Sequence, residues 1–352
     1  MFNGKSVVIT GGTGSLGKVL TKSLLAGDAG TPCKITVFSR DEAKQHFMRM
    51  EHQQKEKVTD EIIYHNFERL LQFRIGDVRN YHSVCSVLKG ADIVINAAAL
   101  KQVPSCEYFP YEAVMTNITG AENIVRAIRE NDLPVETVVC VSTDKACKPV
   151  NVMGMSKSLQ ERVFIAANIT IPNTRFICVR YGNVLASTGS VIPLFHEQIK
   201  NGGPITITTE DMTRFLLPLE KAVDTIFAAI KEALPGETFV PKVRSAKIVD
   251  VAKALIGNRN ISLKITGIRP GEKVHEIMVS EEEAWRTYVR GDYYAIKAML
   301  PELVKKEEKG PALTKEYSSN SDLMNFEETI DLLRKNNLMA DHEIMEKGKL
   351  LR

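Results

Sequence analysis

The feature that most constrains the fold is a glycine-rich turn near the start of the chain. The apolar run Ser6–Thr10 is followed by Gly11, Gly14 and Gly17 in the pattern G-x-x-G-x-x-G, and Gly14–Leu25 has the spacing of a helix. The first glycine allows a tight turn, the second lets the backbone approach a pyrophosphate, and the third lets the helix pack on the sheet. The helix N-terminus offers N–H groups and a partial positive charge to phosphates. The turn therefore predicts a dinucleotide site formed by Gly11, Thr13, Gly14, Ser15, Leu16 and Gly17.

Short apolar runs rich in Val and Ile alternate with helical patterns across the first half of the chain. The strand candidates are Ser6–Thr10, Lys34–Phe38, Leu71–Ile75, Ile93–Asn96, Thr137–Ser142 and Phe176–Tyr181, and the helix candidates between them are Gly14–Leu25, Asp41–Lys55, Ala113–Asn131 and Met155–Ala167. Continuously apolar strands are typical of buried parallel sheets. The alternation predicts an α/β fold with a Rossmann-like, doubly wound parallel sheet.

A chain of 352 residues is long enough for this sheet and a second, smaller lobe. We expect a cofactor domain over residues 1–185, completed by parts of 215–240. Residues 186–300 are expected to form a smaller, interleaved α/β substrate lobe, and 301–352 a C-terminal extension with an amphipathic helix at Phe326–Asn336. Leu219–Ala233 predicts a helix, Gly189–Thr209 predicts loops with a short strand, and Met339–Arg352 predicts a solvated helix.

Composition excludes several classes of protein. The net charge of +3 is too small to indicate nucleic-acid binding. The apolar run Ala91–Leu100 is interrupted by Asp92 and Asn96, and no run approaches the 18 apolar residues of a membrane span. Because a strand begins within the first six residues, we expect no signal peptide and a cytoplasmic protein. None of the six cysteines forms a C-x-x-C pair, so we expect no metal site and reduced thiols.

The tip of the second strand bears on the choice of cofactor. Dinucleotide sites for NAD usually place an acid there to hold the ribose 2′-hydroxyl, whereas a cation suits the 2′-phosphate of NADP. Here Ser39 and Arg40 occupy the tip, and Lys44 follows. These residues favour NADP, while Asp41 keeps NAD as an alternative.

The third and fourth strands end in further candidates for cofactor contact. Asp77 and Val78 follow the third strand, where Asp77 either accepts a hydrogen bond from adenine or caps the next turn. Ala97 and Ala98 follow the fourth, and their small side chains let a cofactor lie against the backbone or let a helix pack closely.

The fifth strand ends in Ser142-Thr143-Asp144-Lys145, so hydroxyls, a carboxylate and an amine stand together at its carboxyl end. Ligands bind at that edge of an open α/β sheet. Met153 and Lys157 follow with the Y-x-x-x-K spacing, with methionine in the place of tyrosine. The true match Tyr293–Lys297 lies outside the predicted cofactor domain, so we do not expect it to be catalytic.

Together these segments resemble an extended short-chain dehydrogenase/reductase and, more closely, the soluble UDP-N-acetylglucosamine 4,6-dehydratases of polysaccharide and capsule synthesis (CapE/WbjB type). The resemblance covers nearly the whole chain. Its segments are TGGTGSLG at 10–17, FSRDEAKQ at 38–45, GDVRN at 76–80, NAAALKQVP at 96–104, TN at 116–117, STDKA at 142–146, NVMGMSK at 151–157, VRYGNV at 179–184, GSVIPLF at 189–195, MTRFL at 212–216, RPGEKVHE at 269–276, GDYY at 291–294 and EYSSNSD at 316–322.

The resemblance implies a lyase that oxidises C4 of UDP-N-acetylglucosamine with NADP⁺, loses water across C5 and C6, and returns hydride to C6. Lys145 is then the base at C5, Asp144 the acid at C6, and Lys157 a ligand of the nicotinamide ribose. We expect Thr143 to contact the sugar 4-hydroxyl, because Met153 cannot take its proton. A lysine base works best with a lowered pKa, which burial and nearby positive charge are expected to supply.

The same resemblance, with the chemistry of each side chain, suggests further ligands of cofactor and substrate. Arginine forks suit a pyrophosphate. Thr116 is expected at the cofactor. The substrate candidates are Lys101, which is also a candidate for the cofactor, Asn183, Arg214, Arg269, Glu272 and His275.

Several alternatives stay open. The segments GDYY and EYSSNSD favour inversion at C5, and a C5-retaining dehydratase is the alternative. A UDP-sugar C4 epimerase, which is an isomerase, shares the fold but normally keeps the tyrosine that Met153 replaces. A catalytically silent NADP-binding protein is the third possibility. Relatives suggest a homo-oligomer.

Overall fold

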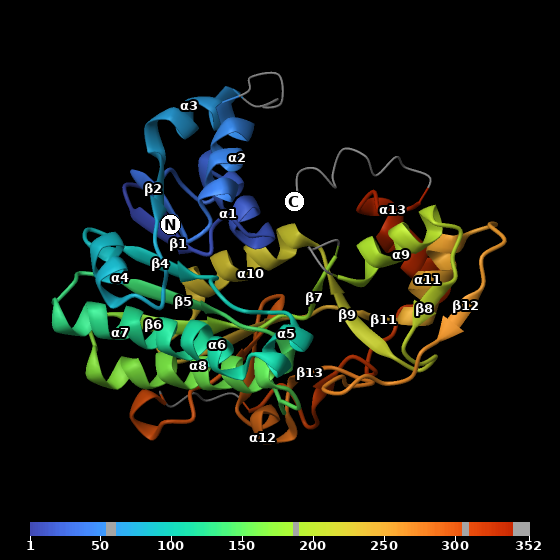
Figure 1. The fold of residues 1–352 in the computed structure, drawn as a ribbon. Helices are drawn as coiled ribbons and strands as arrows, with labels where there is room; N and C mark the ends of the chain where they lie inside the picture. The colour runs from blue at the N-terminus through green and yellow to red at the C-terminus, as the bar shows by residue number, and fades with distance from the viewer. Residues whose placement is uncertain (54–60, 186–189, 305–309, 341–352) are drawn as a thin grey trace.

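A single large sheet organises the molecule (Figure 1). The structure is a computed structural model and describes residues 1–53, 61–185, 190–304 and 310–340. Strand order in the nine-stranded sheet is β14-β15-β10-β6-β5-β4-β1-β2-β3. Its strands are β1 (Ser6–Thr10), β2 (Lys34–Ser39), β3 (Leu71–Ile75), β4 (Ile93–Asn96), β5 (Thr137–Val141), β6 (Arg175–Val179), β10 (Thr238–Pro241), β14 (Thr287–Arg290) and β15 (Tyr293–Ile296).

The strands from β3 to β10 pair in parallel, and the order 3-2-1-4-5-6 is that of a doubly wound dinucleotide-binding sheet. All six strands predicted in the first half form, with boundaries that differ by no more than two residues. Every residue of β1, β4 and β5 is buried, as a strand covered on both faces requires. The predicted Rossmann-like fold is therefore confirmed.

Helices cover both faces of this sheet (Figure 1). On one face, α1 (Ser15–Ala26), α3 (Glu61–Leu70) and α10 (Leu219–Glu232) share a core with β1 and β6. On the other face, α4 (Tyr81–Leu88), α7 (Gly120–Glu130) and α8 (Val152–Thr170) pack against β4 and β5. The other helical elements of this part of the chain are α2 (Glu42–Gln53), α5 (Val103–Tyr108), α6 (Pro110–Ala113), a π-helical turn at Val114–Thr119 and a 3-10 turn at Asp144–Ala146.

A smaller lobe lies beside the carboxyl ends of the parallel strands (Figure 1). It contains the three-stranded sheet β11-β9-β7 and the pair β12-β8, with its own hydrophobic core. Its elements are β7 (Asn183–Val184), α9 (Val191–Lys200), β8 (Ile205–Ile207), β9 (Thr213–Leu217), β11 (Ser245–Lys247), α11 (Ile248–Ile256), β12 (Leu263–Ile265) and α13 (Phe326–Lys335).

Two expectations for this half of the chain need comment. Loops with a short strand were predicted over Gly189–Thr209, but Val191–Lys200 forms the helix α9, because Ile192 and Phe195 bury one face in the lobe's core. The helices predicted at Leu219–Ala233 and Phe326–Asn336 are confirmed as α10 and α13. Residues 54 and 55 of the helix predicted at Asp41–Lys55, and residues 341–352 of the helix predicted at Met339–Arg352, lie outside the described residues.

The C-terminal segments return to the large sheet. Residues 287–296 form β14 and β15, which extend the sheet beyond β10 in antiparallel pairing. The remaining elements of this part of the chain are β13 (Ile277–Val279), α12 (Glu281–Ala284), a 3-10 turn at Pro301–Leu303 and β16 (Tyr317–Ser318), which pairs with β13. Within the described ranges, no helix is long and apolar enough to cross a membrane.

Candidate active site

The glycine turn between β1 and α1 has the geometry that a dinucleotide site requires. Gly11 has φ +65°, and a Cβ atom there would lie 2.8 Å from the Cα of Ala98. A Cβ on Gly17 would lie 2.4 Å from the Cα of Gly12, so α1 packs directly on the turn. Gly14 precedes α1 and has no side chain to cap the first N–H groups. The three glycines therefore bring backbone N–H groups close to any phosphate bound there.

The residues predicted to recognise the ribose lie at the tip of β2. Ser39 is buried and accepts a hydrogen bond from Gln45, whereas Arg40 is exposed. The guanidinium of Arg40 lies 3.8 Å from Asp77, and Lys44 lies 3.1 Å from Asp41. Both cations thus stand at the tip with carboxylate partners on the protein.

Asp77 and Val78 are placed by the turn after β3. The carboxylate of Asp77 accepts hydrogen bonds from the backbone and the guanidinium of Arg79, at 2.7–2.9 Å. Burial raises the pKa of Asp77, but Arg79 outweighs burial and holds it below its ordinary value. Asp77 thus caps this turn, which is one of the two roles predicted for it. Val78 packs against Gly120, where a Cβ would lie 2.8 Å from its side chain.

The loop after β4 contacts the π-helical turn at Val114–Thr119. Asn117 is fully buried and binds both the backbone N–H and the carbonyl of Leu100, at 2.8 and 3.0 Å. Thr116 is buried beside it, and its hydroxyl has no hydrogen-bond partner among the described residues. Lys101 follows Leu100 and is exposed. An orphaned hydroxyl at the sheet edge fits a bound cofactor.

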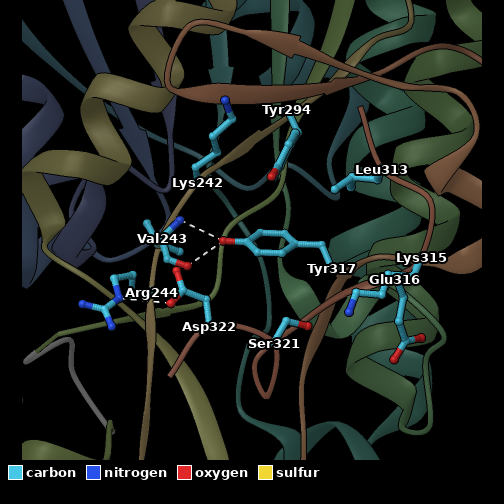
Figure 2. A pocket seen from close by; sticks show the side chains of 10 residues that line it. All are labelled: Lys242, Val243, Arg244, Tyr294, Leu313, Lys315, Glu316, Tyr317, Ser321 and Asp322. Atoms are coloured by element: carbon cyan, nitrogen blue, oxygen red, sulfur yellow. Dashed lines mark hydrogen bonds and ion pairs between the residues drawn. The ribbon is translucent and has the colours of Figure 1, made fainter. Parts of the chain in front are cut away.

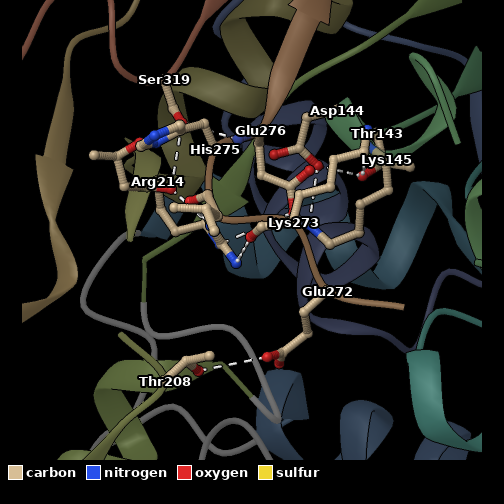
Figure 3. Close-up of polar contacts among 12 residues, drawn as sticks. Thr143, Asp144, Lys145, Thr208, Arg214, Glu272, Lys273, His275, Glu276 and Ser319 are labelled. Carbon is tan, nitrogen blue, oxygen red and sulfur yellow. Dashed lines mark hydrogen bonds and ion pairs between the residues drawn. The ribbon is translucent and has the colours of Figure 1, made fainter. Parts of the chain in front are cut away.

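The predicted catalytic residues come together at the carboxyl end of β5 (Figure 3). Asp144 is fully buried, and its Oδ1 accepts hydrogen bonds from the Thr143 hydroxyl at 2.9 Å and from the Lys145 amine at 3.1 Å. The other carboxylate oxygen, Oδ2, is buried without a partner in the part of the chain that the structure describes. Hydroxyl, carboxyl and amine thus form one hydrogen-bonded group.

Glu276, which the sequence analysis did not single out, completes this group (Figure 3). It is buried, and its Oε1 lies 3.1 Å from the Lys145 amine and 3.9 Å from the Arg214 guanidinium. It ends the segment RPGEKVHE, from which Arg269, Glu272 and His275 were chosen. The segment RPGEKVHE could have pointed to Glu276. However, the sequence spacing between residues 145 and 276 does not show that the two side chains lie beside each other.

The charges in this group set its protonation. Burial raises the pKa of Asp144, and the Lys145 charge offsets only part of that effect. Burial lowers the pKa of Lys145, but Asp144 and Glu276 outweigh it and the pKa is raised. Burial also raises the pKa of Glu276, yet Lys145 and Arg214 hold it below its ordinary value. The expected lowering of the Lys145 pKa is therefore wrong for this structure, because the amine lies between two carboxylates.

Met153 and Lys157 lie on the first turns of α8, away from hydrogen-bonding contact with the Asp144 group. Met153 is buried in a small apolar cluster with Cys106 and Ala113. The Lys157 amine is buried and donates to the carbonyl of Val141 and the amide oxygen of Gln160. Burial lowers the pKa of Lys157. Met153 thus packs where the superfamily's tyrosine is expected, and Lys157 supports the end of β5.

Of the predicted substrate ligands, Arg214 and His275 are hydrogen-bonded to other residues of the protein. Arg214 in β9 donates to the carbonyls of Lys273 and Val274, at 2.9 and 3.0 Å. His275 shares a 2.8 Å hydrogen bond with Thr213. Both residues lie in the group drawn in Figure 3.

Two of the other substrate candidates, Arg269 and Glu272, lie in the segment that carries Glu276, and a third, Asn183, lies in β7. Glu272 lies 3.4 Å from the Thr208 hydroxyl, and Arg269 is exposed. Asn183 in β7 has a buried Oδ1 without a partner among the residues described. These three side chains lie on the lobe that borders the sheet edge.

A hollow of about 380 Å³ lies elsewhere, around Tyr317 (Figure 2). The Tyr317 hydroxyl is hydrogen-bonded to the backbone N–H and carbonyl of Val243, at 2.8 and 2.5 Å. Lys242 and Tyr294 also line it, and none of the predicted site residues does. The hollow therefore adds no ligand to the catalytic group.

Comparison with known proteins shows the family to which the chain belongs. The family model described as "Polysaccharide biosynthesis protein" matches residues 7–298. The chain belongs to this family. The "UDP-N-acetylglucosamine 4,6-dehydratase (inverting)" of Campylobacter jejuni is 42% identical over 334 residues, covering 92% of this chain and 94% of that protein. The "UDP-glucose 4-epimerase" of Rickettsia bellii is 43% identical over 344 residues, covering 95% and 96%.

Solved structures agree on the fold of this family member. Pen from Bacillus thuringiensis is 33% identical with a TM-score of 0.85, over 96% of this chain and 100% of that one. DesIV, a dTDP-glucose 4,6-dehydratase from Streptomyces venezuelae with NAD bound, is 19% identical with a TM-score of 0.64, over 76% and 86%. The fold is that of the extended short-chain dehydrogenases/reductases.

Proposed function

We propose that the protein is a UDP-N-acetylglucosamine 4,6-dehydratase. The observation that carries the proposal is the buried carboxyl of Asp144, hydrogen-bonded to Thr143 and Lys145 at the carboxyl end of β5. Loss of water across C5 and C6 needs an acid at the C6 oxygen and a base at C5. An epimerase needs only transient oxidation at C4. An adjacent acid and amine therefore favour dehydration.

A bound nicotinamide cofactor would accept hydride from C4 and return it to C6. The chain's own residues move the protons. Asp144, whose pKa is raised by burial, gives a proton to the departing C6 oxygen. Lys145 removes the C5 proton when its amine is neutral, and C5 would then receive a proton that comes from solvent on its opposite face, which inverts the centre. Thr143 donates to Asp144 at 2.9 Å. It would contact the 4-hydroxyl, which Met153 cannot deprotonate and whose proton would pass to solvent as hydride leaves C4.

We infer that the cofactor is NADP, held at the glycine turn. Arg40 and Lys44 stand where a 2′-phosphate would lie, although each already has a carboxylate neighbour. Thr116 would lie along the dinucleotide, as would Ala97, Ala98, Val78 and Lys101. Lys157 would then act mainly by supporting the β5 edge. NAD is the alternative, and Asp41 and Asp77 are the acids that would support it.

The substrate assignment draws on relatives as well as on the site. The Campylobacter relative is named for UDP-N-acetylglucosamine and for inversion at C5, and we propose both for this chain. We propose that residues 1–185 bind the cofactor and that the lobe over 186–300 binds the UDP-sugar through Asn183, Arg269 and Glu272. Retention at C5 is the alternative outcome, and we propose that the protein is a homo-oligomer.

UDP-glucose 4-epimerase is the second candidate, because several relatives at 43–44% identity carry that name. Mass spectrometry of the product made from UDP-N-acetylglucosamine with NADP⁺ separates the two. Loss of one water supports the dehydratase. A new isomer of equal mass supports the epimerase, and an unchanged substrate supports a silent cofactor-binding protein.

A further inference from the structure

Glu276 connects the C-terminal part of the chain to the acid–amine pair (Figure 3). Its Oε1 lies 3.1 Å from the Lys145 amine, which is itself 3.1 Å from Asp144 Oδ1. We propose that Glu276 is a positioning residue of the reaction, which holds the Lys145 amine against Asp144 and keeps one proton on that pair. The proposal rests on the proposed function, which it deepens.

Both backbone polar groups of Glu276 are hydrogen-bonded to Ser319. Its N–H donates to the Ser319 hydroxyl at 2.9 Å, and its carbonyl accepts from the Ser319 N–H at 2.8 Å. Ser319 also bonds the Thr213 hydroxyl at 2.7 Å. The segment EYSSNSD, which the proposed reaction leaves without a role, thus acts as the anchor of Glu276. An anchored carboxylate can in turn fix a flexible lysine side chain.

Four charged side chains interact with Glu276. Glu276 faces Lys145 and Arg214 directly, and the charges of Asp144 and Lys273 also act within the group. The negative charge of Glu276 raises the pKa of both Asp144 and Lys145. Glu276 itself stays ionised, because Lys145 and Arg214 lower its pKa. The pH range over which the Asp144–Lys145 pair keeps one proton therefore lies higher than it would without Glu276.

One shared proton is what the reaction needs. When it moves from Lys145 Nζ to Asp144 Oδ1, one N–H bond breaks and one O–H bond forms. The resting ion pair becomes a neutral amine and a carboxylic acid, which are the base for C5 and the acid for the C6 oxygen. No proton is taken from or lost to solvent in this step, and Glu276 does not change its own protonation.

Stability alone gives no reason for a carboxylate at this position. Burying a carboxylate costs several kcal/mol, and replacing a buried ion pair by apolar residues is often neutral. Glu276 Oε2 is buried without a hydrogen-bond partner among the described residues, as is Asp144 Oδ2. Glu283, another buried carboxylate, binds Arg180 with both oxygens, at 2.8 and 3.2 Å. The contacts of Glu276 therefore fit a positioning role, and those of Glu283 fit a structural role.

The test is the variant Glu276→Gln, which keeps the size of the side chain and removes its charge. With UDP-N-acetylglucosamine we expect kcat to fall about 100-fold and KM to change little, because the amine is no longer held in place. Both limbs of the plot of kcat against pH should move to lower pH, since the pKa of each member of the pair falls. Glu276→Asp keeps the charge and should restore the limbs in part.

Two matched variants separate positioning from structure. Glu283→Gln should lower stability but leave both limbs where they are in the wild type. Glu282→Gln, which changes an exposed neighbouring residue, should change neither the stability nor the limbs of the pH profile. A Glu276→Gln profile that matches the wild type, or an equal shift in Glu283→Gln, overturns the proposal.

A second readout does not depend on turnover. In protein with ¹⁵N-labelled lysine, the Lys145 signal is identified by its absence in Lys145→Arg, and its pKa is followed by NMR. Glu276→Gln should lower that pKa. If the pKa falls but the wild type releases no water, the proposed function fails and the placement of Glu276 stands. If the wild type dehydrates and the pKa stays unchanged, the role of Glu276 is refuted.

Discussion

At the scale of single residues, the proposed chemistry depends on two ionisable side chains that lie within hydrogen-bonding distance of each other. Asp144 and Lys145 are neighbours in sequence and remain hydrogen-bonded at 3.1 Å in the fold. Two groups this close titrate as a pair, so their proton belongs to both. In the proposed reaction the pair supplies an acid at C6 and a base at C5, whereas the 4-hydroxyl, which Met153 cannot deprotonate, is the group that Thr143 would contact.

Replacing Asp144 by Asn tests the acid directly. An amide cannot give a proton to the C6 oxygen, so we expect kcat for water loss to fall by about 10²–10⁴-fold. The fold should persist, because the amide oxygen still accepts from Thr143. Steady-state kinetics and circular dichroism check both points. The exposed Asp331→Asn variant is the control and should match the wild type.

The choice of cofactor can be tested at Arg40. Its guanidinium is exposed at the tip of β2, 3.8 Å from Asp77. In Arg40→Ser, we expect Kd for NADP⁺ to rise about tenfold or more while Kd for NAD⁺ changes little, because only NADP⁺ carries the 2′-phosphate. Titration calorimetry measures both constants. An equal loss for the two cofactors would show that Arg40 does not recognise that phosphate.

The sequence was informative about these residues where chemistry and local spacing coincide. Asp144 and Lys145 were found because they follow a buried strand directly. Glu276 was missed because its contact with Lys145 depends on how a distant segment returns to the sheet edge. The direction of the Lys145 pKa was wrong for the same reason, since the second carboxylate was unknown.

At the scale of elements, the turn between β1 and α1 carries the dinucleotide site. Gly11→Ala would bring a Cβ to 2.8 Å from Ala98 in a left-handed backbone conformation. The conformation alone costs about 1–2 kcal/mol. We expect weaker cofactor binding, by about tenfold or more in Kd as measured by fluorescence titration.

Gly90→Ala is the matched control for this prediction. Gly90 has φ +72° but no atom within 4 Å of an added Cβ. The variant should lose a similar amount of stability and keep its affinity for the cofactor. Equal affinities in the two variants would contradict the role of the close approach at Gly11.

The strands of the first half and the helices α1, α2, α7 and α8 could be predicted because their pattern is local, whereas α3, α4 and α5 were not among the predicted helices. Continuously apolar runs became β1, β4 and β5, and the glycine spacing fixed the start of α1. The helix α9 was missed because the Gly, Pro and Thr residues around it suggested loops. Its apolar face packs on elements that follow it in the chain, including α11, and a local reading does not include them.

At the scale of the whole molecule, a buried ionic network joins the C-terminal segments to the sheet. Arg180, directly after β6, binds Glu161 of α8 at 2.7 Å and Glu283 of α12 at 2.8 Å. Burial raises the pKa of Glu283, but Arg180 outweighs it and lowers the pKa to about 2. The network lies beneath the strand ends that carry the candidate site.

Glu283→Gln should destabilise the protein by about 3 kcal/mol, because it leaves part of a buried charge unpaired. A lowered pKa contributes stability above the ordinary value of 4.5, which is lost as pH falls toward about 2. Urea unfolding should therefore show a smaller loss between these pH values in the variant than in the wild type. Parallel pH dependences in the two proteins would contradict this account.

In the proposed reaction, a buried carboxyl and an adjacent amine expel a sugar oxygen without a tyrosine. The most direct measurement is incubation of the purified protein with UDP-N-acetylglucosamine and NADP⁺ in D₂O, followed by mass spectrometry and NMR. We predict a product that has lost one water and carries deuterium at C5, and neither change with Lys145→Met. An isomer of equal mass with hydrogen retained at C5 would contradict the claim.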